Sequence, residues 1–379
     1  MRSTFNLGRV AGIEIGIHYT WLLAFALISW SLAEGYFPTT LPHASQLTYW
    51  LMGIAGALLL VGSVLLHELS HSLVARQRGL RVDSITLFIF GGVSNLSSDA
   101  TRPADEFVVA GVGPLTSLVL AGLSWALGYV FHNSIDIVAA LLGYLAFANA
   151  TLGVFNLVPG FPLDGGRVLR GVLWAVTGSL RKATRVASYT GQAIGYVLIL
   201  LGVSSLLGGD VLSGLWIAFI GWFLSGAAES TRQEQAVREV LSGIAVRLVM
   251  NTSPPVASPR ATVESFVFER AVQHGERAVL IVEAGRLLGL VTLADVKRVD
   301  RDLWATTPLA EIMSSADLQT VTPETDVATA LELMTTRAIH QVPVLADGQV
   351  VGMISRAEIL EMLQVRAELD LPAPRAVAG

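Results

Sequence analysis

The segment LLHELSHSLVAR, residues 65–76, carries His67, Glu68 and His71 at the end of a strongly apolar stretch. The two histidines are four residues apart, so a helix places both imidazoles on one face, where they could share a metal ion. Glu68 lies about 100° further around such a helix, close enough to take a proton from an attacking water. HExxH on a helix is a known zinc-site pattern in which the glutamate acts as general base.

The surroundings of this motif favour a metal site over a chance match. Residues 50–66 contain no charged side chain, so the motif follows a segment that can enter a bilayer. An ionisable side chain at membrane depth costs roughly 3 kcal/mol on insertion scales. HExxH also occurs by chance on soluble or interfacial helices, but three ionisable groups within one turn of an apolar helix need a function.

A catalytic zinc usually has three protein ligands and one open position, which predicts a further ligand. Asp164 is the main candidate, within FNLVPGFPLDGGRVLR (155–170), where prolines and glycines interrupt the helix and shape a turn. By itself, Asp164 could instead cap the helix that follows. Asn156 could simply donate a hydrogen bond to a neighbouring helix.

The composition indicates a membrane protein. Hydrophobic residues make up 53% of the 379 residues, charged residues only 15%, and the mean hydropathy is +0.59. Soluble proteins carry about 25% charged residues. The chain has no cysteine, which excludes disulfides and thiolate metal sites, and its net charge of −5 gives no indication of a nucleic-acid partner. We expect no signal peptide in the N-terminal residues.

Six apolar stretches predict six transmembrane helices. They span residues 17–33, 49–75, 107–131, 137–158, 190–207 and 211–228. The last two are short, and we expect a helical hairpin rather than one broken element. Arginine and lysine lie before the first stretch and in alternate loops, whereas the loops at 34–48, 132–136 and 208–210 have none. The positive-inside rule then places both termini in the cytosol.

HELSH, taken together with NLVPGFPLDGG (156–166), closely resembles the paired motifs of the site-2 protease family, which are intramembrane zinc metalloproteases. The segment GVGPLTSL (111–118) is similar to a small-residue segment on the intervening helix of that family. The resemblance covers most of residues 1–228, and both motifs occur in the expected order on the expected helices.

The resemblance implies a role for each candidate site residue. His67, His71 and Asp164 would bind one zinc ion per chain, and Glu68 would act as general acid and base. Asn156 would steady the substrate or the developing oxyanion.

The depth of the proposed zinc site in the membrane and the segment that follows the motif both indicate how a substrate could bind. His67 precedes Arg76 by nine residues, about 13 Å along a helix, so the zinc would lie inside the membrane but nearer the cytosol. VDSITLFIFGGVSNL (82–96) predicts a strand or hairpin. Its exposed edge could hold an unwound substrate by strand addition, as in the family, although a plain hairpin without substrate contact is the alternative.

The C-terminal part is a second, soluble domain. Residues 231–379 hold 33 of the 55 charged residues, and 229–245 would form a linker. GLVTLADV (289–296) matches GMISRAEI (352–359) at an offset of 63 residues, one of three such matches. Each repeat predicts a helix, two short strands around a glycine turn, and a second helix.

This α+β pattern resembles a tandem pair of cystathionine-beta-synthase (CBS) domains. The CBS module would span 246–364, with its two repeats at about 246–300 and 309–364. A C-terminal tail, 365–379, would follow the module.

The resemblance to CBS pairs implies an adenine-nucleotide site for ATP, ADP or AMP. The matching positions are Thr292 and Asp295 in the first repeat, and Ser355 and Glu358 in the second. Glu358 departs from the usual aspartate. The alternative is a packed dimerisation module without a ligand.

Taken together, these features predict a zinc protease of the cell membrane. It would cut single-span membrane proteins near the cytosolic side of the lipid bilayer, with a cytosolic CBS pair as regulator and a homodimer through that pair. A CBS-regulated transporter or channel is the alternative, although its polar residues should be spread over several spans. A catalytically silent scaffold is a third reading, against which the intact Glu68 argues.

Overall fold

The computed structural model describes residues 4–80, 82–89, 91–96, 100–132, 135–315 and 318–369. The chain divides into two compact units, Met1–Gln235 and Ala236–Gly379. Each unit has buried hydrophobic clusters of its own, and each is described by itself below.

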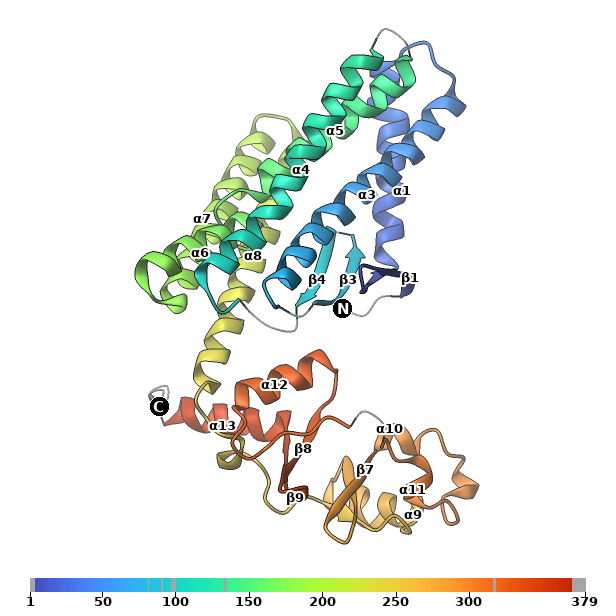
Figure 1. Ribbon diagram of the computed structural model, residues 1–379. Coiled ribbons are helices and arrows are strands. Elements are labelled where there is room, and N and C mark those ends of the chain that lie inside the picture. Colours follow the sequence, from blue (N-terminus) through green and yellow to red (C-terminus); the bar gives the residue numbers. More distant parts are fainter. Residues whose placement is uncertain are drawn as a thin grey trace. The chain divides into compact units, whose positions relative to one another are not determined.

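The first unit is a bundle of long helices (Figure 1). Five helices in the described part of the chain are long and apolar enough to cross a membrane. They are α3 (Gln46–Gln77), α4 (Pro103–Phe131), α5 (Asp136–Asn156), α7 (Leu180–Leu207) and α8 (Val211–Leu241). Helices α3, α4 and α5 pack side by side, and small or polar residues occupy many of their buried positions.

The first predicted span differs from the other five. Most of its residues, 17–33, lie in α1 (Thr20–Ser31) and at the start of a π-helical turn η1 (Leu32–Tyr36), and α2 (Phe37–Thr40) follows without a gap. Pro38 has no N–H to donate to the backbone carbonyl of Glu34, and its ring crowds that carbonyl. The regular series of α-helical hydrogen bonds is therefore interrupted at this point. The regular part, α1, has 12 residues, fewer than a span needs.

The predicted hairpin of α7 and α8 is present. Glycines of the two helices meet backbone to backbone, since a Cβ on Gly195 would lie 2.7 Å from the carbonyl oxygen of Gly221. Such close approach through small residues is the usual way in which membrane helices associate. Helix α7 begins at Leu180 and thus includes residues expected in a loop, and α8 stays helical through most of 229–245, the expected linker.

A four-stranded sheet completes the first unit. Its order is β1 (Phe5–Val10), β2 (Ile13–Ile17), β3 (Val82–Phe88) and β4 (Gly91–Leu96), with β2 and β3 parallel and the other pairs antiparallel. The hairpin predicted for 82–96 is therefore β3 and β4, and β4 is an edge strand. Both strands contact α3.

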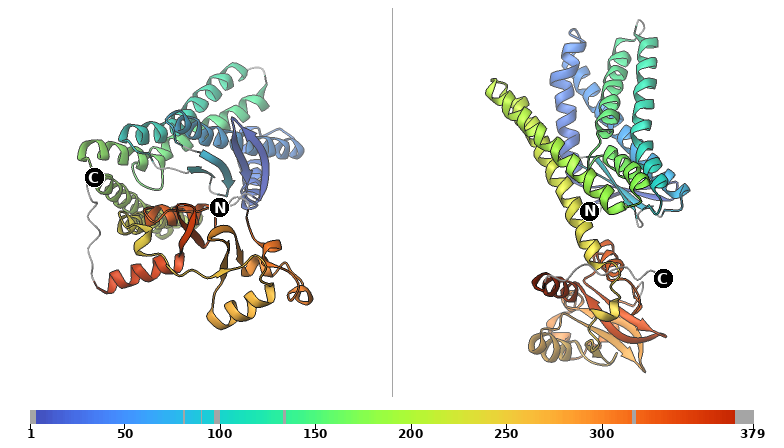
Figure 2. Two further views of the ribbon diagram at one scale, coloured as in Figure 1. Left: turned by 60° about the horizontal axis from the view of Figure 1, so that its bottom comes forward. Right: turned by 90° about the vertical axis from the view of Figure 1, so that its left-hand side faces the viewer.

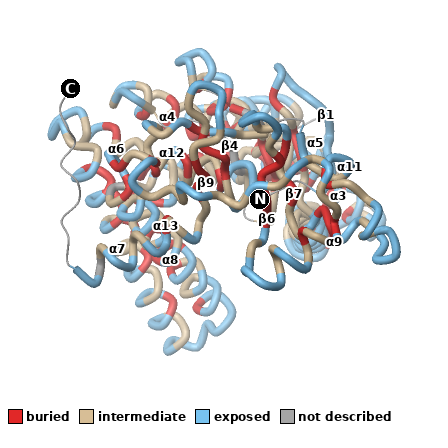
Figure 3. Tube along the Cα trace, turned by 90° about the horizontal axis from the view of Figure 1, so that it is seen from below, coloured by how far each residue is buried: buried red, intermediate tan, exposed pale blue. Residues whose placement is uncertain are grey.

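The second unit has a five-stranded sheet in the order β5-β6-β7-β9-β8. Strands β6 (Ala278–Glu283) and β7 (Arg286–Thr292) correspond to β8 (Gln341–Ala346) and β9 (Gln349–Ser355), and each pair starts 63 residues apart. This spacing equals the predicted repeat. Buried residues, red in Figure 3, occur in the helices of the first unit and in the strands and helices of the second.

The remaining elements of the second unit are short apart from two helices (Figure 2). They are η2 (Val246–Leu248), β5 (Val256–Ala257), α9 (Val263–Ser265), η3 (Phe266–Val272), α10 (Leu293–Val296), η4 (Arg301–Leu303), α11 (Leu309–Ile312), α12 (Val327–Thr336) and α13 (Arg356–Glu368). Most of the predicted tail, residues 370–379, lies outside the described residues, as do Arg2 and Arg81 of the charge pattern.

Candidate active site

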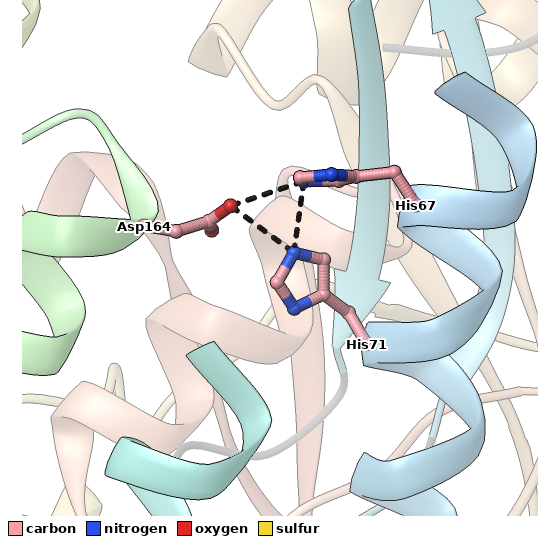
Figure 4. Close-up of side chains that lie close together, drawn as sticks. All are labelled: His67, His71 and Asp164. Atoms are coloured by element: carbon pink, nitrogen blue, oxygen red, sulfur yellow. Dashed lines mark hydrogen bonds and ion pairs between the residues drawn. The ribbon is translucent and has the colours of Figure 1, made fainter. Parts of the chain in front are cut away.

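Three side chains from distant parts of the sequence meet inside the first unit (Figure 4). His67 and His71 project from one face of α3, and Asp164 is the first residue of α6 (Asp164–Thr177). The Nε2 atoms of the two histidines lie 3.2 Å apart, and Oδ2 of Asp164 lies 3.1 and 3.2 Å from them. Both histidines are buried, with 4% of the surface of His67 and 6% of the surface of His71 exposed.

This triangle has the dimensions of a zinc site. Two ligand atoms at about 2.0–2.1 Å from a tetrahedral zinc lie about 3.3 Å from each other. Burial alone would raise the pKa of the Asp164 carboxyl. Hydrogen bonds with the imidazoles of His67 and His71 lower the pKa by more than burial raises it. The pKa therefore lies below its usual range, and the group is a carboxylate. The donor set is thus two imidazole nitrogens and one anionic oxygen, as in many catalytic zinc sites.

Hydrogen bonds on the far side of each ring fix its orientation. Nδ1 of His71 lies 2.6 Å from the carbonyl oxygen of Val109, which can only accept, so Nδ1 carries the proton. The Nε2 atom of a neutral His71 then carries the lone pair with which an imidazole binds a metal ion. Nδ1 of His67 has its own partner, the Ser117 hydroxyl at 2.9 Å.

Helix α4 leaves room for these rings because residue 113 is glycine. A Cβ atom at Gly113 would lie 2.0 Å from Nε2 of His71 and 2.7 Å from Nε2 of His67. No side chain fits there without moving the histidines. The segment GVGPLTSL therefore supplies both the space at Gly113 and the hydroxyl of Ser117.

The turn before α6 places Asp164 through two further glycines. A Cβ on Gly165 would lie 2.4 Å from the backbone of Leu157, and one on Gly166 would lie 2.4 Å from the backbone of Gly160. The chain therefore doubles back on itself tightly. Leu163, without a side-chain cap, is the N-cap of α6, so the alternative role of Asp164 as the cap is wrong.

The three residues line a cavity of about 940 Å³ in the first unit. Its walls come mainly from apolar side chains of α3, α5 and α8, including Leu60, Phe147, Leu152, Trp216, Phe219, Phe223 and Leu224. Such a mostly apolar pocket with a few convergent polar groups is typical of a ligand or active site.

Glu68 and Asn156 also line this cavity. Gly92 of β4 packs directly on Glu68, since a Cβ at Gly92 would lie 2.3 Å from Cγ of Glu68. The amide of Asn156 donates to the carbonyl of Leu152 in its own helix at 3.0 Å. The structure thus gathers all five membrane-domain residues predicted from the sequence around one cavity.

Comparison with known proteins identifies the family. Sequence models match the chain for peptidase family M50 at residues 55–135 and 131–202, and for the CBS domain at 245–302 and 309–365. A Mycobacterium tuberculosis protein named zinc metalloprotease Rip3 is 33% identical over 370 residues, which is 96% of this chain and 94% of that protein. The chain belongs to peptidase family M50. It is a site-2 protease with a CBS pair, which confirms both resemblances.

Two further relatives of this M50 peptidase also match over nearly the full length of both chains, and a solved structure matches part of this chain. The Synechocystis zinc metalloprotease sll0528 is 31% identical, with 97% of each chain covered. The Methanocaldococcus jannaschii zinc metalloprotease MJ0392 is 27% identical, with 96% of this chain and 97% of that one covered. The solved site-2 protease of M. jannaschii is 26% identical, covers 60% of this chain and 94% of its own, and superposes with a TM-score of 0.42.

The residues proposed for nucleotide binding have structural roles at two helix starts. The Thr292 hydroxyl donates to Asp295 at 2.7 Å, and the two form the capping box of α10. The Ser355 hydroxyl likewise donates to Glu358 at the start of α13. This matching geometry in both repeats follows from their shared pattern of a hydroxyl three residues before an acid.

Three residues of the M50 domain were not predicted as site residues. Gly113 and Ser117 lie in GVGPLTSL, which the sequence had marked only as a small-residue segment. Glu106, one turn before Val109, has no sequence signal beyond being acidic near an apolar helix. Gly113 and Ser117 contact the histidines of α3, and Glu106 pairs with arginines of α6. A local sequence pattern does not encode such contacts between helices.

Proposed function

We propose that this M50 peptidase is a zinc-dependent intramembrane endopeptidase. The observation that carries the proposal is the triangle of His67, His71 and Asp164. The distances between its three ligand atoms are those of a zinc site, and the triangle opens into a largely apolar cavity. These residues would hold one zinc ion per chain. Among the residues that the structure describes, they form the one cluster of three such ligands, which favours a hydrolase over a transporter with polar groups on several spans.

Zinc, when bound, would act as a Lewis acid on the scissile carbonyl and on water. Glu68, beside the ligands on the cavity wall, would accept the proton of the attacking water and pass it to the leaving amine. Asn156 would rotate its amide from Leu152 toward the substrate carbonyl and stabilise the oxyanion.

The cavity and strand β4 support a single-span membrane protein as substrate. A transmembrane helix hides its carbonyls in its own hydrogen bonds, so it must unwind before a peptide bond can be attacked. The edge strand β4 lies against Glu68 and could pair with the unwound segment by strand addition. Apolar cavity walls would then receive the side chains next to the cut, nearer the cytosolic side of the bilayer.

We also propose a cell-membrane location with six spans and both termini in the cytosol. The five long helices and the helical segment 20–40 would provide the spans. The arginine and lysine residues of alternate loops support this orientation. The CBS pair would then lie in the cytosol.

The CBS pair would regulate cleavage. Its positions Thr292, Asp295, Ser355 and Glu358 would contact an adenine nucleotide such as ATP, ADP or AMP after the cap bonds open. Pairing of two CBS modules would give a homodimer. Release of a membrane-held regulator is the physiological outcome that fits such controlled cleavage.

The test is cleavage of a single-span membrane protein by the purified chain in liposomes. Wild type should cut near the cytosolic side and stop when a chelator removes zinc. Glu68→Gln should keep zinc and lose cleavage by about 10²–10⁴-fold, because only the acid and base is removed. Cleavage by Glu68→Gln at the wild-type rate would refute the assigned role.

A further inference from the structure

Helix α4 presents one buried face toward the two histidines of the proposed site. Its buried residues recur at Glu106, Val109, Gly113 and Ser117, three or four positions apart, as one helix face requires. Val109 accepts from His71, Ser117 bonds His67, and Gly113 gives both rings space. Glu106, the first residue of this set, forms ion pairs with α6, the helix that carries Asp164.

Glu106 is 1% exposed, and its carboxylate binds two arginines of α6. Nε of Arg167 lies 3.1 Å and Nη2 of Arg170 lies 2.5 Å from the same oxygen, Oε1. These arginines follow Asp164 by three and six residues. A charge-assisted bond to each of two turns of α6 restrains both the rotation and the position of that helix along its axis.

Two more contacts surround this ion pair, and the first of them reaches the turn before Asp164. The guanidinium of Arg170 lies over the ring of Phe161, 5.3 Å from its centroid. Further along α6, a Cβ on Gly171 would lie 3.1 Å from the amide nitrogen of Phe107, so the two helices are in close contact beside Glu106. The α6 helix is therefore held between a glycine contact and a buried ion pair.

We propose that Glu106 is a positioning residue of the metal site, which acts through Arg167 and Arg170 to direct Asp164 at the two histidines. A buried carboxylate is costly unless it is paired, and removal of one partner leaves the other charges uncompensated. Residues that orient metal ligands typically change metal affinity by 10–100-fold when mutated. The proposal rests on Asp164 being a zinc ligand, as argued above.

The experiment measures zinc affinity of the full chain in detergent by competition with a chelator, with thermal unfolding as a check on the fold. Glu106→Gln should weaken zinc binding by about 10–100-fold. Asp105→Asn is the matched control, since this neighbouring carboxylate pairs with Arg78 at the end of α3 and should leave the affinity unchanged.

A second background separates positioning from general destabilisation. In a chain with Arg167→Gln and Arg170→Gln, which keeps all three ligands, adding Glu106→Gln should not weaken zinc binding further, because its effect passes through these two arginines. An equal loss in both backgrounds, or wild-type affinity in folded Glu106→Gln, would overturn the proposal. Absence of zinc in the wild type would instead refute the metal site itself, so the two failures are distinct.

Discussion

At the scale of single residues, the proposed metal site combines residues one turn apart on α3 with residues that only the packing of helices brings to it. HExxH lies within five positions on one helix, so the sequence itself places both histidines and Glu68. Asp164 was predicted from its turn and from the family motif. The His67–Ser117 contact spans 50 residues and depends on how α3 packs on α4. The same holds for Gly113, whose role is only the space it leaves.

Gly113→Ala tests that space. The added methyl group would lie 2.0 Å and 2.7 Å from the Nε2 atoms of His71 and His67 and displace both rings, so we expect at least a 100-fold loss of zinc affinity, roughly the upper end for disturbed ligand geometry. Gly111→Ala is the control on the same helix, because a Cβ there meets nothing within 4 Å. Both changes favour helix by about 1 kcal/mol, so helix propensity cannot explain a difference. Equal zinc affinity in the two variants would contradict the packing described.

At the scale of elements, apolar length and turn residues predicted the long helices and the β3–β4 hairpin. The first predicted span is helical from Thr20 on, and the π-helical turn that follows α1 comes just before Pro38, whose missing backbone donor the sequence does show. The extension of α8 beyond the apolar stretch was not evident, since the charged residues after 228 are compatible with either helix or linker. The position of β4 against Glu68 depends on tertiary packing.

Gly92→Ala tests the contact between β4 and the proposed catalytic base. The new Cβ would overlap Cγ of Glu68 and push its carboxylate from its place on the cavity wall. We expect cleavage to fall about 100-fold, as for a displacement of about 1 Å at a reacting group, while zinc affinity stays at the wild-type level. Kinetics and chelator competition on the same preparation would separate the two. Unchanged cleavage would show that Glu68 does not depend on β4.

At the scale of the whole molecule, the charge distribution and the 63-residue repeat predicted two domains. The boundary between the compact units lies at 235/236, inside α8. Leu241, in the last turn of α8, is fully buried in the hydrophobic core of the second unit. The sequence could not place this boundary, because one helix contributes residues to both units.

A chain that ends at Gln235 tests the division of labour. All proposed zinc ligands and the cavity lie before that residue, so the truncated chain should keep about one zinc and cleave substrate. Its cleavage should no longer respond to ATP, ADP or AMP, whereas that of the full chain should. Loss of zinc from a folded truncated chain would mean that the second unit is part of the metal site.

The measurement that tests the central claim most directly is the zinc content of the detergent-purified full chain, beside His71→Ala and Asp164→Ala. The geometry of the site predicts about one zinc per wild-type chain and its loss in both variants while they stay folded. A folded wild type without zinc, even after zinc is supplied, would contradict the metal site and the peptidase mechanism built on it.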